Sequence, residues 1–105
     1  MPFLQFVPRP FDTGAIQTFA PHLSGVYGIS NASEWIYIGE TDDIHSSLLT
    51  HLQEPSAAVM RRHPTGFVFE VCDRARRTAR QDRLVSEYGP KCNGQSPAGR
   101  TSRYA

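Results

Sequence analysis

Two short runs of apolar and aromatic residues, separated by a turn sequence, constrain the fold of this chain more than any other feature. The first run covers residues 25–30 (Gly-Val-Tyr-Gly-Ile-Ser) and the second covers residues 35–40 (Trp-Ile-Tyr-Ile-Gly-Glu). β-branched and aromatic residues favour strands, and the intervening Asn31-Ala32-Ser33 supplies turn chemistry. The pattern predicts an antiparallel hairpin with a tyrosine in each strand.

The residues after this hairpin alternate between helical and strand patterns. They predict, in order, a helix over about 43–53 capped by Asp42 or Asp43, a short helical piece in 56–63, a strand over 67–72 and a helix over about 74–88 that ends at Gly89-Pro90. In the last helix, the candidate core positions are Ala75, Ala79, Leu84, Val85 and Tyr88. The order β-β-α-β-α predicts an α+β domain with a small three-stranded antiparallel sheet flanked by helices.

The two ends of the chain differ from this central part. Residues 1–23 carry several prolines and form an N-terminal arm, with a short helix from near Asp12, that we expect to pack on the core through Phe3, Phe6, Phe11 and Phe19. Residues 94–105 read as a flexible C-terminal tail. The 105 residues are enough for one domain.

Charge is unevenly distributed along the chain. Residues 1–60 hold six acids and one base, and residues 61–105 hold ten bases and four acids, so the two parts carry −5 and +6 for a net charge of +1. The basic part either faces a polyanion or neutralises the acidic part across a folded surface. No apolar run approaches 18 residues, and the two cysteines form no CxxC pair. The sequence therefore predicts a cytoplasmic protein with no membrane partner and no cysteine-based zinc site.

The hairpin resembles the paired signature of the GIY-YIG nucleases. Gly25-Val26-Tyr27 stands for the first triplet of that signature and Tyr37-Ile38-Gly39 for the second. The resemblance covers residues 24–93 and implies a GIY-YIG domain with the same order of elements and DNA as a candidate partner. In active members, the two tyrosines lie near the scissile phosphate, an arginine on the first helix stabilises its charge, and a glutamate on a later helix holds one divalent ion, usually magnesium.

This resemblance assigns six candidate catalytic positions: Tyr27, Tyr37, Ser47, His51, Gln81 and Asn93. Ser47 stands where the family has its arginine, and Gln81 stands where it has the metal-binding glutamate. A hydroxyl brings no positive charge to a phosphate, and an amide is a poor anchor for a hard cation. The sequence thus predicts a catalytically degenerate domain that needs no cofactor, with magnesium expected only if the protein is active.

Other interpretations stay open. An active, divalent-metal-dependent endonuclease would need relocated residues, such as Glu70 or Glu87 as the acid and Arg80 or Arg83 as the cation. Arg76, Arg80 and Arg83 share a helical face and are candidates for nucleic-acid binding, or are simply solvated. A third interpretation is a protein-interaction module, with a protein partner or a homodimer. We expect no histidine metal site, and we expect Trp35 to be a packing residue at the edge of the sheet.

Overall fold

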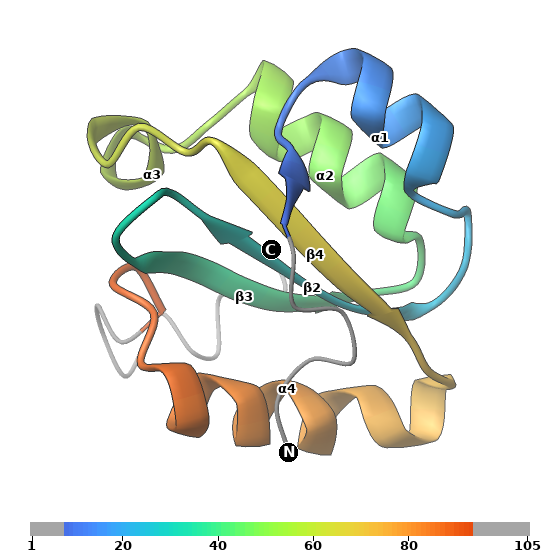
Figure 1. Ribbon diagram of the computed structural model, residues 1–105. Helices are drawn as coiled ribbons and strands as arrows, with labels where there is room; N and C mark the ends of the chain where they lie inside the picture. Colours follow the sequence, from blue (N-terminus) through green and yellow to red (C-terminus); the bar gives the residue numbers. More distant parts are fainter. Residues whose placement is uncertain (1–7, 94–105) are drawn as a thin grey trace.

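The computed structural model describes residues 8–93, in which helices cover both faces of an antiparallel sheet (Figure 1). The elements are β1 (Arg9–Pro10), α1 (Thr13–Phe19), β2 (Gly25–Ser30), β3 (Trp35–Thr41), α2 (Ile44–Gln53), α3 (Ala57–Arg61), β4 (Gly66–Val71) and α4 (Arg74–Tyr88). The strand order is β1-β4-β2-β3. The α+β prediction is confirmed, and the expectations for Phe3, Phe6 and residues 94–105 lie outside the described residues.

The sheet has four strands instead of the three that the sequence predicts. The additional strand, β1, has two residues, and it pairs with β4 through Arg9 opposite Phe67 and Pro10 opposite Gly66. Proline cannot donate to a sheet ladder, so it is tolerated at an edge such as this one. One of the two residues is a proline and the other stands between two prolines, so the strand carries no pattern of its own and the sequence did not predict it.

Two apolar layers fill the space between the sheet and its helices. On the side of α1 and α2, the cluster includes Ile16, Ile29, Ile44, Leu48 and Phe67, all fully buried. On the side of α4, a smaller cluster contains Val26, Ile38, Val68 and Leu84. Figure 1 shows α1 and α2 above the sheet and α4 below it.

An irregularity in the β2–β3 pairing determines which way the β3 side chains point. Ile29 pairs with Tyr37 and Ser30 pairs with Trp35, so Ile36 is an extra residue on β3. Such a bulge breaks the strict alternation of side chains. Ile36 and Tyr37 accordingly both pack on the α2 side, while the Trp35 ring lies 4.6 Å from that of Tyr88 on α4. Trp35 is therefore a packing residue, as predicted.

The limits of α2 and α4 agree with the sequence within one residue, whereas α3 is shorter than the predicted 56–63. Asp12, Asp43, Ser56 and Asp73 each cap a helix by accepting a hydrogen bond from a backbone N–H in its first turn. Gly89 ends α4 in the left-handed conformation, with φ of 57°. None of the helices within residues 8–93 has the length and apolar character required to span a membrane.

The inward face of α4 agrees with the predicted one only in the second half of the helix. Leu84 is buried and Val85 and Tyr88 pack against the same cluster, as predicted. Ala75 and Ala79 are exposed, whereas Gln81 is buried and Arg77 is half-buried. Polar residues take the inward positions of the first half, so the apolar pattern pointed to the wrong residues there.

Candidate functional site

A cavity of about 680 Å³, the first cavity, opens between α2, the hairpin and α4. Its walls include five of the six candidate catalytic positions: Tyr27, Tyr37, Ser47, His51 and Gln81. These residues come from β2, β3, α2 and α4, so the tertiary fold brings them together from distant parts of the sequence.

Three aromatic side chains form one wall of the first cavity. The Tyr27 hydroxyl and Nε2 of His51 are 2.8 Å apart, and the Tyr37 ring centroid lies 5.1 Å from that of His51 and 6.1 Å from that of Tyr27. Gly39 makes this approach possible, because a Cβ there would lie 2.8 Å from the Tyr27 hydroxyl oxygen. The second triplet's glycine thus leaves room for the first triplet's tyrosine.

Burial keeps this aromatic wall uncharged. Desolvation, followed by interaction with Tyr37, raises the pKa of Tyr27 well above its usual value. Desolvation lowers the pKa of His51, so its imidazole is neutral at neutral pH. Neither side chain brings a formal charge to the first cavity.

Ser47 lies on the first turn of α2, facing the first cavity. Its hydroxyl donates to Oγ1 of Thr41 at 2.6 Å, and Thr41 Oγ1 also accepts from the backbone N–H of Asp43. The serine is therefore part of the junction between β3 and α2. It offers no positive charge at the position where the resemblance predicts an arginine.

Gln81 projects from α4 into the first cavity and is only 4% exposed. The next residue, Asp82, is exposed on the outer side of the helix. A one-residue change of alignment would therefore not bring a carboxylate into the first cavity from α4.

Two further residues that the sequence did not point to, Arg77 and Glu40, also line the first cavity. Nε of Arg77 donates to Oε1 of Glu40 at 3.1 Å, and NH1 donates to Oγ of Ser24 at 3.1 Å and to Asp42. Hydrogen bonds to Asp42 and Glu40 raise the pKa of Arg77 against the opposing effect of desolvation. Arg77 is one helical turn before Gln81, and this spacing was the signal that could have identified it.

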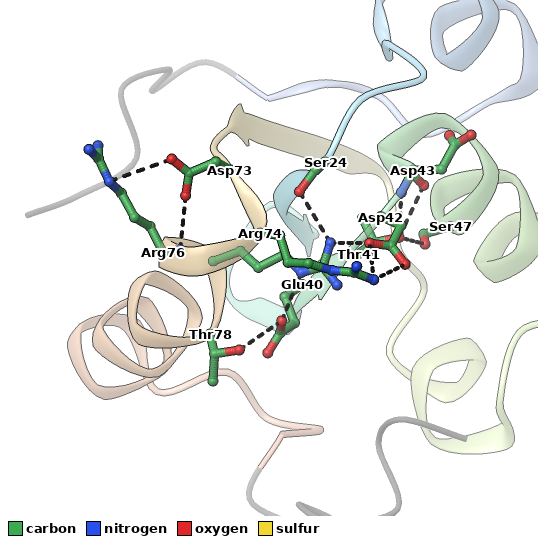
Figure 2. A network of polar contacts seen from close by, with 11 residues as sticks. Ser24, Glu40, Thr41, Asp42, Asp43, Ser47, Asp73, Arg74, Arg76 and Thr78 are labelled. Atoms are coloured by element: carbon green, nitrogen blue, oxygen red, sulfur yellow. Dashed lines mark hydrogen bonds and ion pairs between the residues drawn. The ribbon is translucent and has the colours of Figure 1, made fainter.

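Figure 2 shows the polar contacts that join the residue before β2, the end of β3 and the first half of α4. Ser24 precedes β2, Glu40 lies on β3 with Asp42 just after it, and Thr78 follows on α4. Oε1 of Glu40 accepts from Thr78 as well as from Arg77, while Oε2 is buried without a hydrogen-bond partner among the described residues. The guanidinium of Arg77 thus forms ion pairs with carboxylates of the protein itself.

The side chains present do not fit a magnesium ion at the position that the resemblance predicts for it. The α4 residue there is the neutral Gln81, and Glu40 is already engaged by Arg77 through one oxygen. Within residues 8–93, no three His, Cys, Asp or Glu side chains converge on a point where a metal ion could be held. A hard divalent cation requires charged oxygen ligands that are free to bind it.

The remaining predicted residues lie away from the first cavity. Asn93 accepts from the backbone N–H of Ile38 at 2.7 Å and donates to its carbonyl at 2.6 Å. Together with the backbone bonds from Lys91 to Trp35 and from Cys92 to Ile36, this places residues 91–93 along the outer edge of β3. Asn93 therefore contacts the strand that carries Tyr37.

The three arginines predicted to bind nucleic acid have different surroundings. Arg80 makes two hydrogen bonds to Glu70, at 2.7 and 2.8 Å, and both side chains are largely buried. Arg76 is exposed and lies 3.7 Å from Asp73, and Arg83 is exposed. Glu70, one acid of the relocated-site interpretation, is thus held on the α4 side of the sheet and does not line the first cavity.

Comparison with known proteins identifies the fold. No family model matches the chain, and no curated protein matches it. The GIY-YIG N-terminal endonuclease domain of UvrC from Thermotoga maritima aligns with a TM-score of 0.66 and 23% identity, over 80% of this chain and 100% of that one, in a point-mutant crystal structure with its catalytic divalent cation. A structure of the same domain with magnesium aligns with a TM-score of 0.65 and 24% identity, over 78% of this chain and 99% of that one. The chain has the GIY-YIG endonuclease fold, as the hairpin motif predicted.

Proposed function

We propose that this protein is a catalytically degenerate GIY-YIG-fold domain, which keeps the shape of the nuclease site without its cutting chemistry. The observation that carries this proposal is that Ser47 and Gln81 line the same cavity as Tyr27, Tyr37 and His51. The positions that the family uses for charge are in the site, but they hold neutral side chains.

The electrostatics of the first cavity support this proposal. Its charged lining residues are Glu40, Asp42 and Glu54 against Arg77, which is three carboxylates against one guanidinium. Phosphodiester cleavage requires positive charge where negative charge develops in the transition state. A guanidinium that already binds two carboxylates does not supply it, and the loss of a phosphate-stabilising arginine costs on the order of 10³–10⁵ in rate.

Restoration of the two missing groups tests the proposal. We expect the wild-type protein to leave supercoiled plasmid intact in magnesium or manganese, and the double variant Ser47→Arg/Gln81→Glu to nick it. Gln53→Arg/Ser86→Glu is the matched control, because it makes the same charge changes at exposed positions of the same two helices. Addition of Tyr27→Phe to the active double variant should remove the cleavage again.

The outcomes separate the proposal from its competitor. Cleavage by the wild-type protein would contradict the proposal. Cleavage by neither protein, with both shown to be folded by circular dichroism, would mean that Ser47 and Gln81 are not the positions that lost the chemistry. Cleavage by the exposed-position control would show that added charge alone explains any gain.

One observation favours a second candidate, an active endonuclease with relocated residues. Arg77 and Glu40 lie in the first cavity, and Oε2 of Glu40 has no hydrogen-bond partner within the described part of the chain. In that case Arg77 would release its carboxylates when substrate binds. Wild-type cleavage that Arg77→Gln and Glu40→Gln each abolish would establish this candidate.

A further inference from the structure

A second cavity, of about 420 Å³, lies where the turn between β2 and β3 meets the end of α3. It is lined by Glu34, Ala58, Arg61, Arg62 and His63. Two guanidinium groups and an imidazole therefore face a single carboxylate. This balance is opposite to that of the first cavity, where carboxylates outnumber the one cation.

The wall of the second cavity is held by Asn31 in the turn. Its Nδ2 donates to the backbone carbonyl of Arg62 at 2.7 Å, and its Oδ1 accepts from the backbone N–H groups of Ser33 and Glu34, each at 2.9 Å. One side chain thus fixes the end of α3 against the hairpin. The backbone that carries the basic residues is therefore held beside the hairpin turn.

The carboxylate of Glu34 is committed to one of the two arginines. NH1 of Arg62 lies 3.2 Å from both of its oxygens, and Nδ2 of Asn31 is also within hydrogen-bond distance. Although desolvation opposes the shift, the hydrogen bonds from Arg62 and Asn31, together with the charges of Arg62 and Lys91, hold the pKa of Glu34 below its usual value. Arg61, by contrast, is exposed and forms no ion pair with residues 8–93.

His63 has a backbone conformation that is unusual for its residue type. Its φ of 55° lies in the left-handed region, and it is the one non-glycine residue with positive φ between residues 8 and 93. The position follows the end of α3, and the N–H of His63 donates to the carbonyl of Met60 at 3.0 Å. Glycine or asparagine is usual at such a position, and a side chain there costs on the order of 1 kcal/mol. A costly side chain that faces a basic cavity suggests a use for that side chain.

We infer that the second cavity binds a phosphate group, with Arg61 and His63 as the principal donors, while Arg62 neutralises the carboxylate of Glu34. A guanidinium fork matches phosphate oxygens, and an imidazole adds a further donor. The cavity is concave and basic, and its own carboxylate is neutralised by Arg62. This site is independent of whether the first cavity cuts nucleic acid.

Helix α3 connects the two cavities. Ser56, its cap, lines the first cavity, and Arg61, its last residue, lines the second. Five helical residues rise about 8 Å. A nucleic-acid strand with one phosphate in the second cavity would therefore pass beside the first cavity, whereas a free phosphate would occupy the second cavity alone.

Titration of the full-length protein with inorganic phosphate, followed by amide chemical shifts, tests this site. We expect the largest changes at residues 31–34 and 58–63. A second titration with fluorescein-labelled oligothymidine distinguishes the sources of the phosphate: binding at the same residues that is tighter than that of the free anion indicates a nucleic-acid strand, and no gain over the free anion indicates a free phosphate. Changes confined to other regions, such as residues 76–83 of α4, would overturn the assignment.

Two substitutions test the named donors. We expect Arg61→Gln to weaken binding by roughly tenfold or more, and to reduce the slope of log affinity against log salt by about 0.7–0.9 for the oligonucleotide. Arg74→Gln is the matched control, because it removes the same charge from an arginine on α4 whose side chain is 77% exposed. Equal losses for Arg61→Gln and Arg74→Gln would mean that only overall charge matters, and would contradict the site.

His63→Gly separates a binding role from a structural one. Glycine adopts positive φ at no steric cost, so we expect this variant to melt at a higher temperature and to bind phosphate more weakly. A higher melting temperature with unchanged phosphate affinity would overturn the role of His63. Because the variant is expected to be more stable, weaker binding cannot be attributed to unfolding.

Discussion

Both cavities beside α3 contain arginine and carboxylate side chains, but they differ in whether an arginine is left without an ion pair among the described residues. In the first cavity, Arg77 donates to Glu40 and to Asp42, so its charge is used within the protein. In the second cavity, Glu34 is held by Arg62, and Arg61 forms no ion pair within the described residues. The difference shows that the presence of an arginine in a cavity does not by itself indicate an anion site. The carboxylates around it decide whether its charge is available to a ligand.

Removal of the charge of Arg77, which is paired within the protein, should have the largest effect on the free energy of unfolding. Arg77→Met leaves the carboxylate of Glu40 largely buried without its partner, and we expect a loss of about 3 kcal/mol in urea denaturation. Arg74→Gln is the control, because Arg74 also pairs with Asp42 but its side chain is 77% exposed. Equal losses for the two variants would show that Arg77 is not an internal counter-ion.

A smaller loss is expected when the aromatic wall of the first cavity is displaced. In Gly39→Ala, the new Cβ would lie 2.8 Å from atoms of both Tyr27 and Tyr37, so we expect about 2 kcal/mol of destabilisation and an altered near-ultraviolet circular dichroism spectrum. Gly14→Ala serves as the control, since the nearest atom to its Cβ is 3.6 Å away and alanine favours the helix. Unchanged tyrosine signals in Gly39→Ala would argue against the close approach of the rings.

Removal of the Asn31 side-chain amide, which holds the wall of the second cavity, should lower the free energy of unfolding. Asn31→Ala removes the bonds to Arg62, Ser33 and Glu34, and we expect a loss of about 1.5 kcal/mol in the same denaturation experiment. Ser33→Ala, which removes only an exposed hydroxyl contact at 3.3 Å, should change stability little. A neutral result for Asn31→Ala would mean that α3 is held mainly by Val59 in the core.

The smallest effect concerns the pH dependence of stability, and it should be traceable to the first cavity. Burial lowers the pKa of His51 in the folded state below its usual 6.5, so the unfolded chain takes up a proton first as the pH falls. The contribution of the neutral imidazole to the free energy of unfolding is present above pH 6.5 and is lost as the pH falls through the pKa of the folded state. We expect this loss to be at most about 1 kcal/mol between pH 6.5 and 5.5. His51→Gln should flatten the denaturation profile in this range. An equally steep profile in His51→Gln would assign the effect to other groups.

The sequence predicted the fold well where local chemistry decides it. The hairpin followed from β-branched and aromatic residues around Asn31-Ala32-Ser33, and the end of α4 followed from Gly89-Pro90. Family resemblance also brought Tyr27, Tyr37, Ser47, His51 and Gln81 to one cavity, as the structure places them. A single sequence is therefore enough to recognise local turn and capping residues and a motif with fixed spacing.

The contacts of charged side chains could not be predicted in the same way. Arg77 reaches carboxylates more than 30 residues earlier in the chain, and Arg80 turns toward Glu70 on a strand. Helical spacing alone grouped Arg80 with Arg76 and Arg83, although one is largely buried and the others are exposed. Such pairings depend on how α4 lies across the sheet, which no local pattern encodes.

The attachment of residues 91–93 to β3 has a consequence for the protein in concentrated solution. β3 is an outer strand, and open backbone groups on such a strand are a template for pairing with another chain. Here Lys91 and Cys92 bond the carbonyls of Trp35 and Ile36, and the amide of Asn93 satisfies both backbone groups of Ile38 as a neighbouring peptide would. Residues 91–93 therefore cover backbone groups of β3 that could otherwise pair with another chain. We expect a chain cut at residue 90 to form intermolecular β-sheet more readily.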